Sequence, residues 1–272
     1  MESKTLIRFL FRFLVRSLWR RSNGLVVYIY ELFSLFYESM RSLVTEGERG
    51  GRSAFGVAVI QILFTGVEAL LMVSVIALLI GVIIIIQSFT HMPRVGVGDY
   101  FGKVLVMVVF RELGPLLTAL IVIGRSGSAI ATYQGNMKVS QEIEALEVMG
   151  INPVRYLVTP TIIAAVISMV CLTMYFNIIS ILGGYLISSL KIEMPITVFL
   201  QFVLNALTVT DILISLLKSI IFGIIVSVVA CYHGLSVKIS FQEVPQQTLR
   251  AVMNSIIMAV ILNSGITLLF YI

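Results

Sequence analysis

Four ionisable residues of this sequence stand inside or at the edge of long apolar runs, where charges are rare. Arg111 and Glu112 are neighbours in one run, while Asp211 and Lys218 belong to a later one. Because a charge in apolar surroundings is costly, such residues usually face a water-filled cavity or a subunit interface. A structural ion pair between two helices, for example Glu112 with Lys218, would also account for them. The residues alone favour neither interpretation, and one pair could serve both purposes.

Small residues and a proline follow the first charged pair. Gly114 and Pro115 come directly after it, and because proline lacks a backbone N–H we expect a helix kink there. Gly124 and Gly127 stand on either side of Ser126, and such small residues let helices approach each other closely. These positions predict helix packing and a local distortion next to the charges.

The composition identifies the environment of these helices. Of the 272 residues, 58% are hydrophobic and only 12% are charged, with a mean hydropathy of +1.04. Soluble domains have about 25% charged residues. A chain this apolar belongs in a bilayer, where helices satisfy their own backbone hydrogen bonds. We therefore expect an all-α, polytopic membrane protein.

The apolar runs predict five transmembrane helices, since one span needs about 20 apolar residues. We expect them near residues 67–89, 100–123, 157–188, 211–232 and 249–271. The first run is too long for a single upright span, so residues 56–66 are expected to form an interfacial or partly re-entrant piece. A short amphipathic segment is expected at residues 196–207.

Basic residues at the amino end predict how the chain is oriented. Arg8, Arg12, Arg16 and Arg20 recur every four residues and so share one helical face, opposite apolar and aromatic residues. This pattern is typical of an amphipathic helix in the headgroup plane and not of nucleic-acid binding. We therefore divide the chain into an interfacial segment, 1–55, and a transmembrane domain, 56–272. The positive-inside rule places the amino terminus in the cytoplasm, and five spans then place the carboxyl terminus outside.

A polar stretch over residues 124–153 contains a predicted short helix, from about Val139 to Met149, that ends before Gly150 and Pro153. It combines acidic residues with apolar ones, namely Glu142, Glu144 and Glu147 with Ile143, Leu146 and Met149. Such a helix could dock into a groove of another protein, or it could be a solvated connector.

Four sequence blocks, in order, resemble the MlaE/YrbE family of ABC permeases. They are R-E-L-G-P at 111–115, G-R-S-G-S-A at 124–129, E-x-x-A-L-x-x-M-G-I-x-P at 142–153 and L-x-K-S-x-x-F at 216–222. The resemblance covers the chain from about Gly56 to its carboxyl end.

The resemblance implies a homodimer in the bacterial inner membrane, with a separate cytoplasmic ABC ATPase that carries ATP and Mg²⁺. It implies a periplasmic MCE-domain protein and, in some systems, a STAS-domain protein. The substrate is a phospholipid or a related lipid, and transport maintains outer-membrane lipid composition. The cavity that binds the lipid would include Arg111, Glu112, Lys218 and Asn263. Many relatives have an acidic residue at the position of Asn263. Arg111 or Lys218 could then hold a phosphate.

By the same resemblance, the short helix at about residues 139–150 would be a coupling helix that binds the ATPase. The residues expected to contact the ATPase are Glu142, Glu144, Leu146, Glu147, Met149 and Gly150.

Other functions were weighed against this one. An ion- or proton-coupled carrier or channel without an ATPase would also use buried charges. Gly96–Asp99 and Gly124–Gly127 match short strings of intramembrane proteases. Against the aspartyl type, Asp99 is expected in a loop and Asp211 lacks a preceding tyrosine; for the serine type, Ser126 could use only His233 as its base, and a protease is therefore not favoured. No G-x-x-x-x-G-K-[ST] string occurs, so the chain is not expected to hydrolyse ATP itself. Cys171 and Cys231 lack metal-ligand spacing, and neither a metal nor a bound cofactor is expected.

Overall fold

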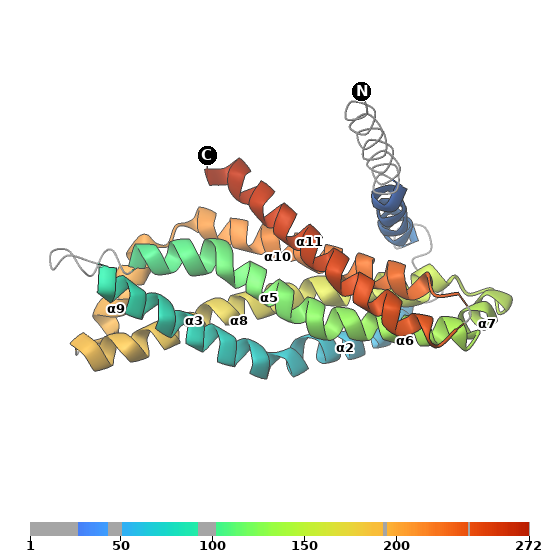
Figure 1. Cartoon of the computed structure of the whole chain (residues 1–272), viewed down its shortest axis with the longest axis horizontal. Helices are drawn as coiled ribbons and strands as arrows, with labels where there is room; N and C mark the ends of the chain where they lie inside the picture. Colours follow the sequence, from blue (N-terminus) through green and yellow to red (C-terminus); the bar gives the residue numbers. More distant parts are fainter. Residues whose placement is uncertain (1–26, 43–50, 92–101, 193–194, 239, 272) are drawn as a thin grey trace, which may run out of the picture.

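The computed structural model describes residues 27–42, 51–91, 102–192, 195–238 and 240–271, and the only regular structure within these ranges is helical (Figure 1). Five helices are long and apolar enough to cross a membrane: Ala58–Ser88, Gly102–Val139, Val154–Leu190, Val209–Leu235 and Glu243–Phe270. The prediction of an all-α protein with five spans is confirmed. The predicted amphipathic face of Arg8 to Arg20 lies outside the described residues, whereas residues 27–42 are helical.

The first apolar run is one nearly continuous helix with a local tightening. Helix α2 (Gly51–Gly66) passes through a single 3₁₀ turn, η1 (Val67–Ala69), into α3 (Leu70–His91). The turn directly follows Gly66, the predicted boundary between the interfacial piece, 56–66, and the first span, 67–89. The interfacial or re-entrant placement of residues 56–66 stays a prediction.

The second helical run is longer than predicted. We expected it to end near residue 123 and to give way to a polar connection, but it continues to Val139. Its segments are η2 (Val106–Leu113), α5 (Gly114–Val122), η3 (Ile123–Gly127) and α6 (Ser128–Val139). The polar and small residues beyond 123 continue the helix because they pack against α10 (Val209–Leu235). A β-carbon on Gly127 would lie 3.3 Å from Val226, and one on Gly234 would lie 2.9 Å from the β-carbon of Gln134.

The predicted short helix is present as α7 (Glu142–Val148). Two residues with positive φ separate it from its neighbours: Gln141, at 60°, precedes it, and Gly150, at 75°, follows it. Its bounds are narrower than the predicted 139–150 because the left-handed Gln141 interrupts the helix after α6.

Helix α8 (Thr159–Ile192), which follows η4 (Val154–Val158), runs along α3, α10 and α2. Its approach to α3 is close: a β-carbon on Gly81 would collide with the Ser180 carbonyl, and one on Gly183 with that of Leu78. The Ser180 hydroxyl donates to the Ala77 carbonyl at 3.0 Å. Glycine on each helix thus permits backbone contact, as is common in membrane bundles.

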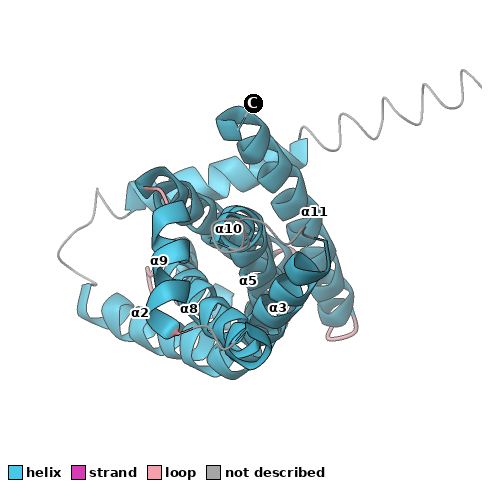
Figure 2. Cartoon of the chain, turned by 90° about the vertical axis from the view of Figure 1, so that its left-hand side faces the viewer, coloured by secondary structure: helices cyan, strands magenta, loops and turns pink. Residues whose placement is uncertain are grey.

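The remaining elements are α9 (Ile196–Ala206), which agrees with the predicted segment 196–207, and α11 (Glu243–Tyr271). Viewed along the bundle, α5 and α10 lie toward its middle, with α3, α8, α9 and α11 around them (Figure 2). The carboxyl-terminal end of α11 diverges from the other helices (Figure 1).

Candidate functional site in the helix bundle

A widened helical segment carries the first charged pair. Val106–Leu113 is π-helical and leads directly into Gly114 and Pro115, at the start of α5. A proline ring clashes with the carbonyl four residues earlier, which here belongs to Arg111, and a π-type turn relieves such a clash. The predicted distortion is therefore present as a widened turn. Gly114 is required there, because a β-carbon would collide with the Asn177 side chain on α8.

Lys218 is the centre of the polar cluster. Its side chain is fully buried, and its Nζ atom donates to the Arg111 carbonyl at 2.7 Å, to Glu112 Oε1 at 3.1 Å and to Thr267 Oγ1 at 2.9 Å. An ammonium group has three N–H donors, so these acceptors satisfy it completely. The ion pair between Glu112 and Lys218, which the sequence analysis gave as one of two open interpretations, is present.

Helix α11 closes the cluster around Glu112. Asn263 Nδ2 donates to Glu112 Oε2 at 2.8 Å, and the Thr267 hydroxyl donates to Glu112 Oε1 at 2.7 Å. Asn263 thus lies with Glu112 and Lys218, while their place in a lipid cavity stays a prediction. Thr267 was not predicted, although it stands four residues after Asn263 and therefore on the same helical face.

A second ion pair joins η2 and α10, as the pair of Glu112 and Lys218 does, but nearer the start of α10. Arg111 Nε lies 2.7 Å from Asp211 Oδ1, and the Asp211 side chain is 1% exposed. Asp211 also forms a capping box with Thr208, since each side chain bonds the other residue's backbone N–H. The sequence placed Asp211 at the end of this span but did not assign it to the site. Its spacing of seven residues from Lys218, two helical turns, was the available signal.

The two cations of the cluster differ in access. The Lys218 side chain is buried and each of its three N–H groups has an acceptor, whereas the Arg111 side chain is 29% exposed. The carboxylate partner of Lys218, Glu112, is 32% exposed. Two cations and two carboxylates leave the cluster formally neutral. Of the two predicted phosphate ligands, Arg111 is the one with an exposed surface.

The predicted coupling residues lie apart from this cluster, on and beside α7. Lys138 Nζ on α6 pairs with Glu144 Oε1 at 2.8 Å, and Ile143 is buried against Met137 and Leu157. The outer face is open, with Val148 89% and Met149 64% exposed. Glu142, Glu147 and Gly150 are exposed as well, and Leu146 is half-buried. The helix is thus anchored on one face and free on the other within this chain.

Of the four predicted packing positions, one has no neighbour. Gly114, Pro115 and Gly127 are buried between helices, but a β-carbon on Gly124 would have no atom within 4 Å. The expected close helix approach at Gly124 is therefore wrong within this chain. The nearby Arg125 pairs with Glu68 and lies over the Phe64 ring, 5.4 Å from its centre.

An apolar cavity of about 730 Å³ lies between the helix of residues 27–42, α10 and α11. Its polar edge is formed by Tyr28, whose hydroxyl lies 3.1 Å from His233 Nε2 and accepts from Asn254 Nδ2 at 3.2 Å. Burial raises the pKa of the Tyr28 phenol, and the hydrogen bond from Asn254 lowers it in part. The phenol is therefore neutral at physiological pH, and the cavity wall is uncharged on this side.

Within the described ranges, no group of three or more His, Cys, Asp or Glu side chains lies close enough together to bind a metal ion.

Comparison with known proteins gives a consistent result. The family model described as Permease MlaE matches residues 58–269. A probable ABC transporter permease protein of Rickettsia prowazekii is 36% identical over 78% of this chain and 82% of its own length. The intermembrane phospholipid transport system permease protein MlaE of Haemophilus influenzae is 28% identical over 81% and 85%. The chloroplastic protein trigalactosyldiacylglycerol 1 of Arabidopsis thaliana is 31% identical over 71% of this chain and 55% of its own length.

Proposed function

Because this chain belongs to the MlaE permease family, we propose that it is the membrane subunit of an ABC transporter for phospholipid or a related lipid. Transport would run between the bacterial inner membrane and a periplasmic MCE-domain protein, and would maintain outer-membrane lipid composition. The name of the Haemophilus relative, an intermembrane phospholipid transport permease, supports this substrate class.

The observation that carries the proposal is the polar cluster around Lys218 inside an apolar bundle. Its partly exposed Arg111 suits a lipid phosphate, because a guanidinium forms strong charge-assisted hydrogen bonds with phosphate oxygens. Asp211 and Glu112 compensate the cations while no lipid is bound. The apolar cavity beside α10 and α11 offers a surface of matching character for an acyl chain.

Energy would come from a separate ATPase that binds α7. The exposed apolar pair Val148 and Met149, next to exposed glutamates, suits a groove with an apolar floor and a basic rim. Closure of two ATPase subunits would push on α7, and α6 would transmit the movement through the pair of Lys138 and Glu144. The amino terminus would be cytoplasmic and the carboxyl terminus periplasmic, and two copies would form the transporter. A STAS-domain protein on the ATPase belongs to the same proposal.

The deciding experiment is a gentle purification of the tagged chain from native membranes, with mass spectrometry of associated proteins and lipids. Recovery of an ABC ATPase and an MCE-domain protein supports the proposal. An intact permease preparation without any ATPase contradicts it and favours an ion- or proton-coupled carrier, for which the Glu112–Lys218 pair would be the proton-relay candidate.

A substitution tests the role of Arg111 directly. We expect Arg111→Ala to lower ATP-dependent lipid transfer at least tenfold, because each charged hydrogen bond contributes about 1.5–3 kcal/mol. Arg111→Lys should retain part of the transfer. Arg250→Ala, at an exposed position of α11, is the matched control and should transfer normally. Normal transfer by Arg111→Ala would remove the headgroup role.

A further inference from the structure

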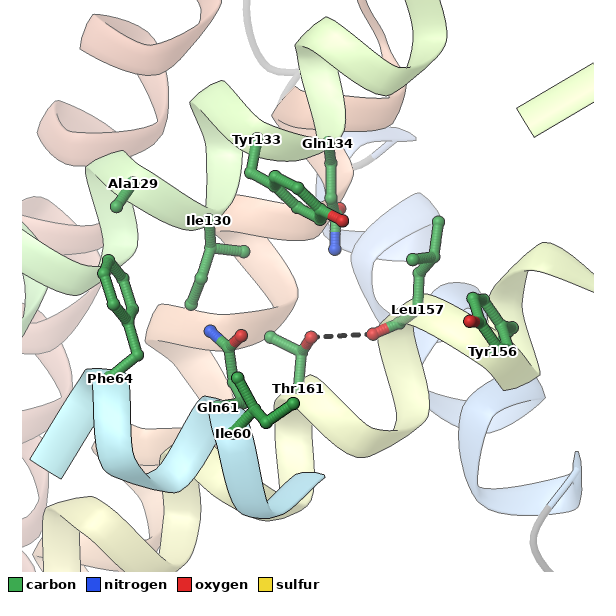
Figure 3. A pocket seen from close by; sticks show the side chains of 10 residues that line it. All are labelled: Ile60, Gln61, Phe64, Ala129, Ile130, Tyr133, Gln134, Tyr156, Leu157 and Thr161. Atoms are coloured by element: carbon green, nitrogen blue, oxygen red, sulfur yellow. Dashed lines mark hydrogen bonds between the residues drawn. The ribbon is translucent and has the colours of Figure 1, made fainter. Parts of the chain in front are cut away.

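Two cavities of the bundle offer no charge to a lipid headgroup. The pocket between α2, α6, η4 and the start of α8 has a volume of about 380 Å³, and none of its ten described lining residues is charged (Figure 3). The larger cavity beside α10 and α11 is likewise lined by uncharged side chains. Because an ionised group without a counter-charge is costly in apolar surroundings, an ionised headgroup needs a different surface of the protein.

The helix that leads into the charged cluster has one open face. Residues 102–105 are α-helical and continue into η2, and Lys103 is exposed, Met107 is 61% exposed and Arg111 is 29% exposed. A spacing of four residues places these three side chains on one side of the helix. The buried positions of the same stretch are Leu105, Val106, Val109 and Phe110. Lys103 therefore lies about two turns from Arg111, on the order of 10 Å along the helix axis.

The backbone next to Lys103 is fixed against α9. A β-carbon on Gly102 would collide with the Phe202 carbonyl, so the two helices touch at this point and hold the lysine at this end of the bundle. The predicted orientation places this end on the outer side of the membrane, where the positive-inside rule does not favour basic residues. Membrane topology therefore gives no reason for a lysine at this position.

Lys103 adds a positive charge to a face that is otherwise balanced. Arg111 pairs with Asp211, and Lys218 pairs with Glu112, so these four residues are neutral together. Among the residues that the structure describes, no carboxylate forms an ion pair with Lys103. The face that runs from Lys103 to Arg111 thus has one positive charge in excess, which an anionic ligand would compensate.

We propose that Lys103 is a second headgroup contact beside Arg111, and that it makes this permease prefer phospholipids of net negative charge over zwitterionic ones. Phosphatidylglycerol brings one negative charge, which matches the excess charge of this face. The ammonium of phosphatidylethanolamine would meet Lys103 as a like charge, while Asp211 and Glu112 already pair with cations of the protein. The inference rests on the proposed function and specifies its substrate.

The test measures headgroup binding without transport. The full chain is placed in phosphatidylcholine nanodiscs with photoactivatable phosphatidylglycerol or, at the same mole fraction, photoactivatable phosphatidylethanolamine. Peptide mass spectrometry then quantifies the label on residues 102–113. We expect phosphatidylglycerol to label this segment about threefold to fivefold more, as an exposed charge pair allows. Added salt should reduce the difference, because exposed charges are screened. Equal labelling by the two lipids, or a label confined to other helices, overturns the proposal.

Substitutions assign the preference to one side chain. Lys103→Gln should remove the difference between the two lipids, Lys103→Glu should reverse it, and Lys103→Arg should keep it. Lys238→Gln is the matched control, because it removes the same charge at an exposed position outside this helix, and it should label as the wild type does. A folded Lys103→Gln protein with the wild-type preference contradicts the proposal.

Recovery of the ATPase separates this inference from the proposed function. A preference that depends on Lys103, in a chain that binds no ATPase, would remove the transport function and keep the contact with anionic headgroups. Recovery of the ATPase together with equal labelling would keep the transporter and remove the preference.

Discussion

At the residue scale, one lysine organises most of the buried charge. Lys218 contacts the η2 segment through the Arg111 carbonyl and Glu112, and α11 through Thr267. An ionised side chain without water needs partners of this kind, because removing one partner leaves an uncompensated charge. The cluster therefore fixes three helices in register, in addition to any part it has in lipid binding.

We predict that Lys218→Met destabilises the protein strongly, on the order of 3–5 kcal/mol, because it leaves Glu112 buried in part without its cation. Thermal unfolding in detergent measures the effect. The double variant Lys218→Met, Glu112→Gln should recover part of the loss, since the remaining amide can be satisfied by Asn263 and Thr267. Equal melting temperatures for the wild type and the single variant would show that the pair contributes no stability.

How much of this cluster the sequence predicted depends on the kind of residue. The pair of Glu112 and Lys218 was predictable because charges inside apolar runs must find partners. Asp211 was seen at the end of its span but was not assigned to Arg111, since the sequence does not show which residue of another helix lies opposite it. Thr267 had only a weak signal, its place one turn after Asn263, because threonine is ordinary in membrane helices and only the fold brings it to Lys218.

At the element scale, helix number and type followed from the apolar runs, but the extent of the second run did not. The polar character of residues 124–153 suggested a connection, although the small residues at 124–129 were predicted to pack against other helices. In a membrane bundle the same residues are packing surfaces, as Gly127 shows by its contact with Val226. The widened η2 segment was likewise predicted only as a kink at Pro115.

The contact between α3 and α8 gives an element-scale prediction. Gly183→Ala should lower the melting temperature by several degrees, because the new β-carbon collides with the Leu78 backbone and the helices must separate. Gly265→Ala is the matched control: the position is helical, nothing lies within 4 Å, and alanine favours helix by about 1 kcal/mol. Thermal unfolding of both variants in detergent is the measurement. A Gly183→Ala protein as stable as Gly265→Ala would mean that the two helices do not touch as described.

Helix α7 supports a second prediction at this scale. Charged substitutions at its exposed apolar pair, Val148→Glu with Met149→Glu, should abolish co-purification of the ATPase while the melting temperature stays unchanged. The reason is that both side chains face away from the bundle and contribute to no core of this chain. The conservative variant Val148→Leu with Met149→Leu should retain the ATPase. Normal ATPase recovery with the charged pair would assign the docking surface to another element.

At the scale of the whole molecule, the exposed part of the polar cluster requires a cover. Arg111 and Glu112 are about 30% exposed, on a bundle whose outer surface carries many large apolar side chains. Lipid tails cannot solvate such charges, so water or another protein surface must lie against them. This agrees with the proposed homodimer and indicates that the face of η2 belongs to the dimer contact.

A cysteine at Met107 tests this arrangement, because Met107 is 61% exposed and lies one turn before Arg111, on the same side of η2. With the exposed Cys171 replaced by alanine and the buried Cys231 retained, we expect Met107→Cys to form a covalent dimer with a short bismaleimide in native membranes. Leu79→Cys, on α3 and 51% exposed, should remain monomeric, since that face would contact lipid. Cross-linking at Leu79 but not at Met107 would move the dimer contact to α3 and leave the charges of η2 to a cavity within one chain.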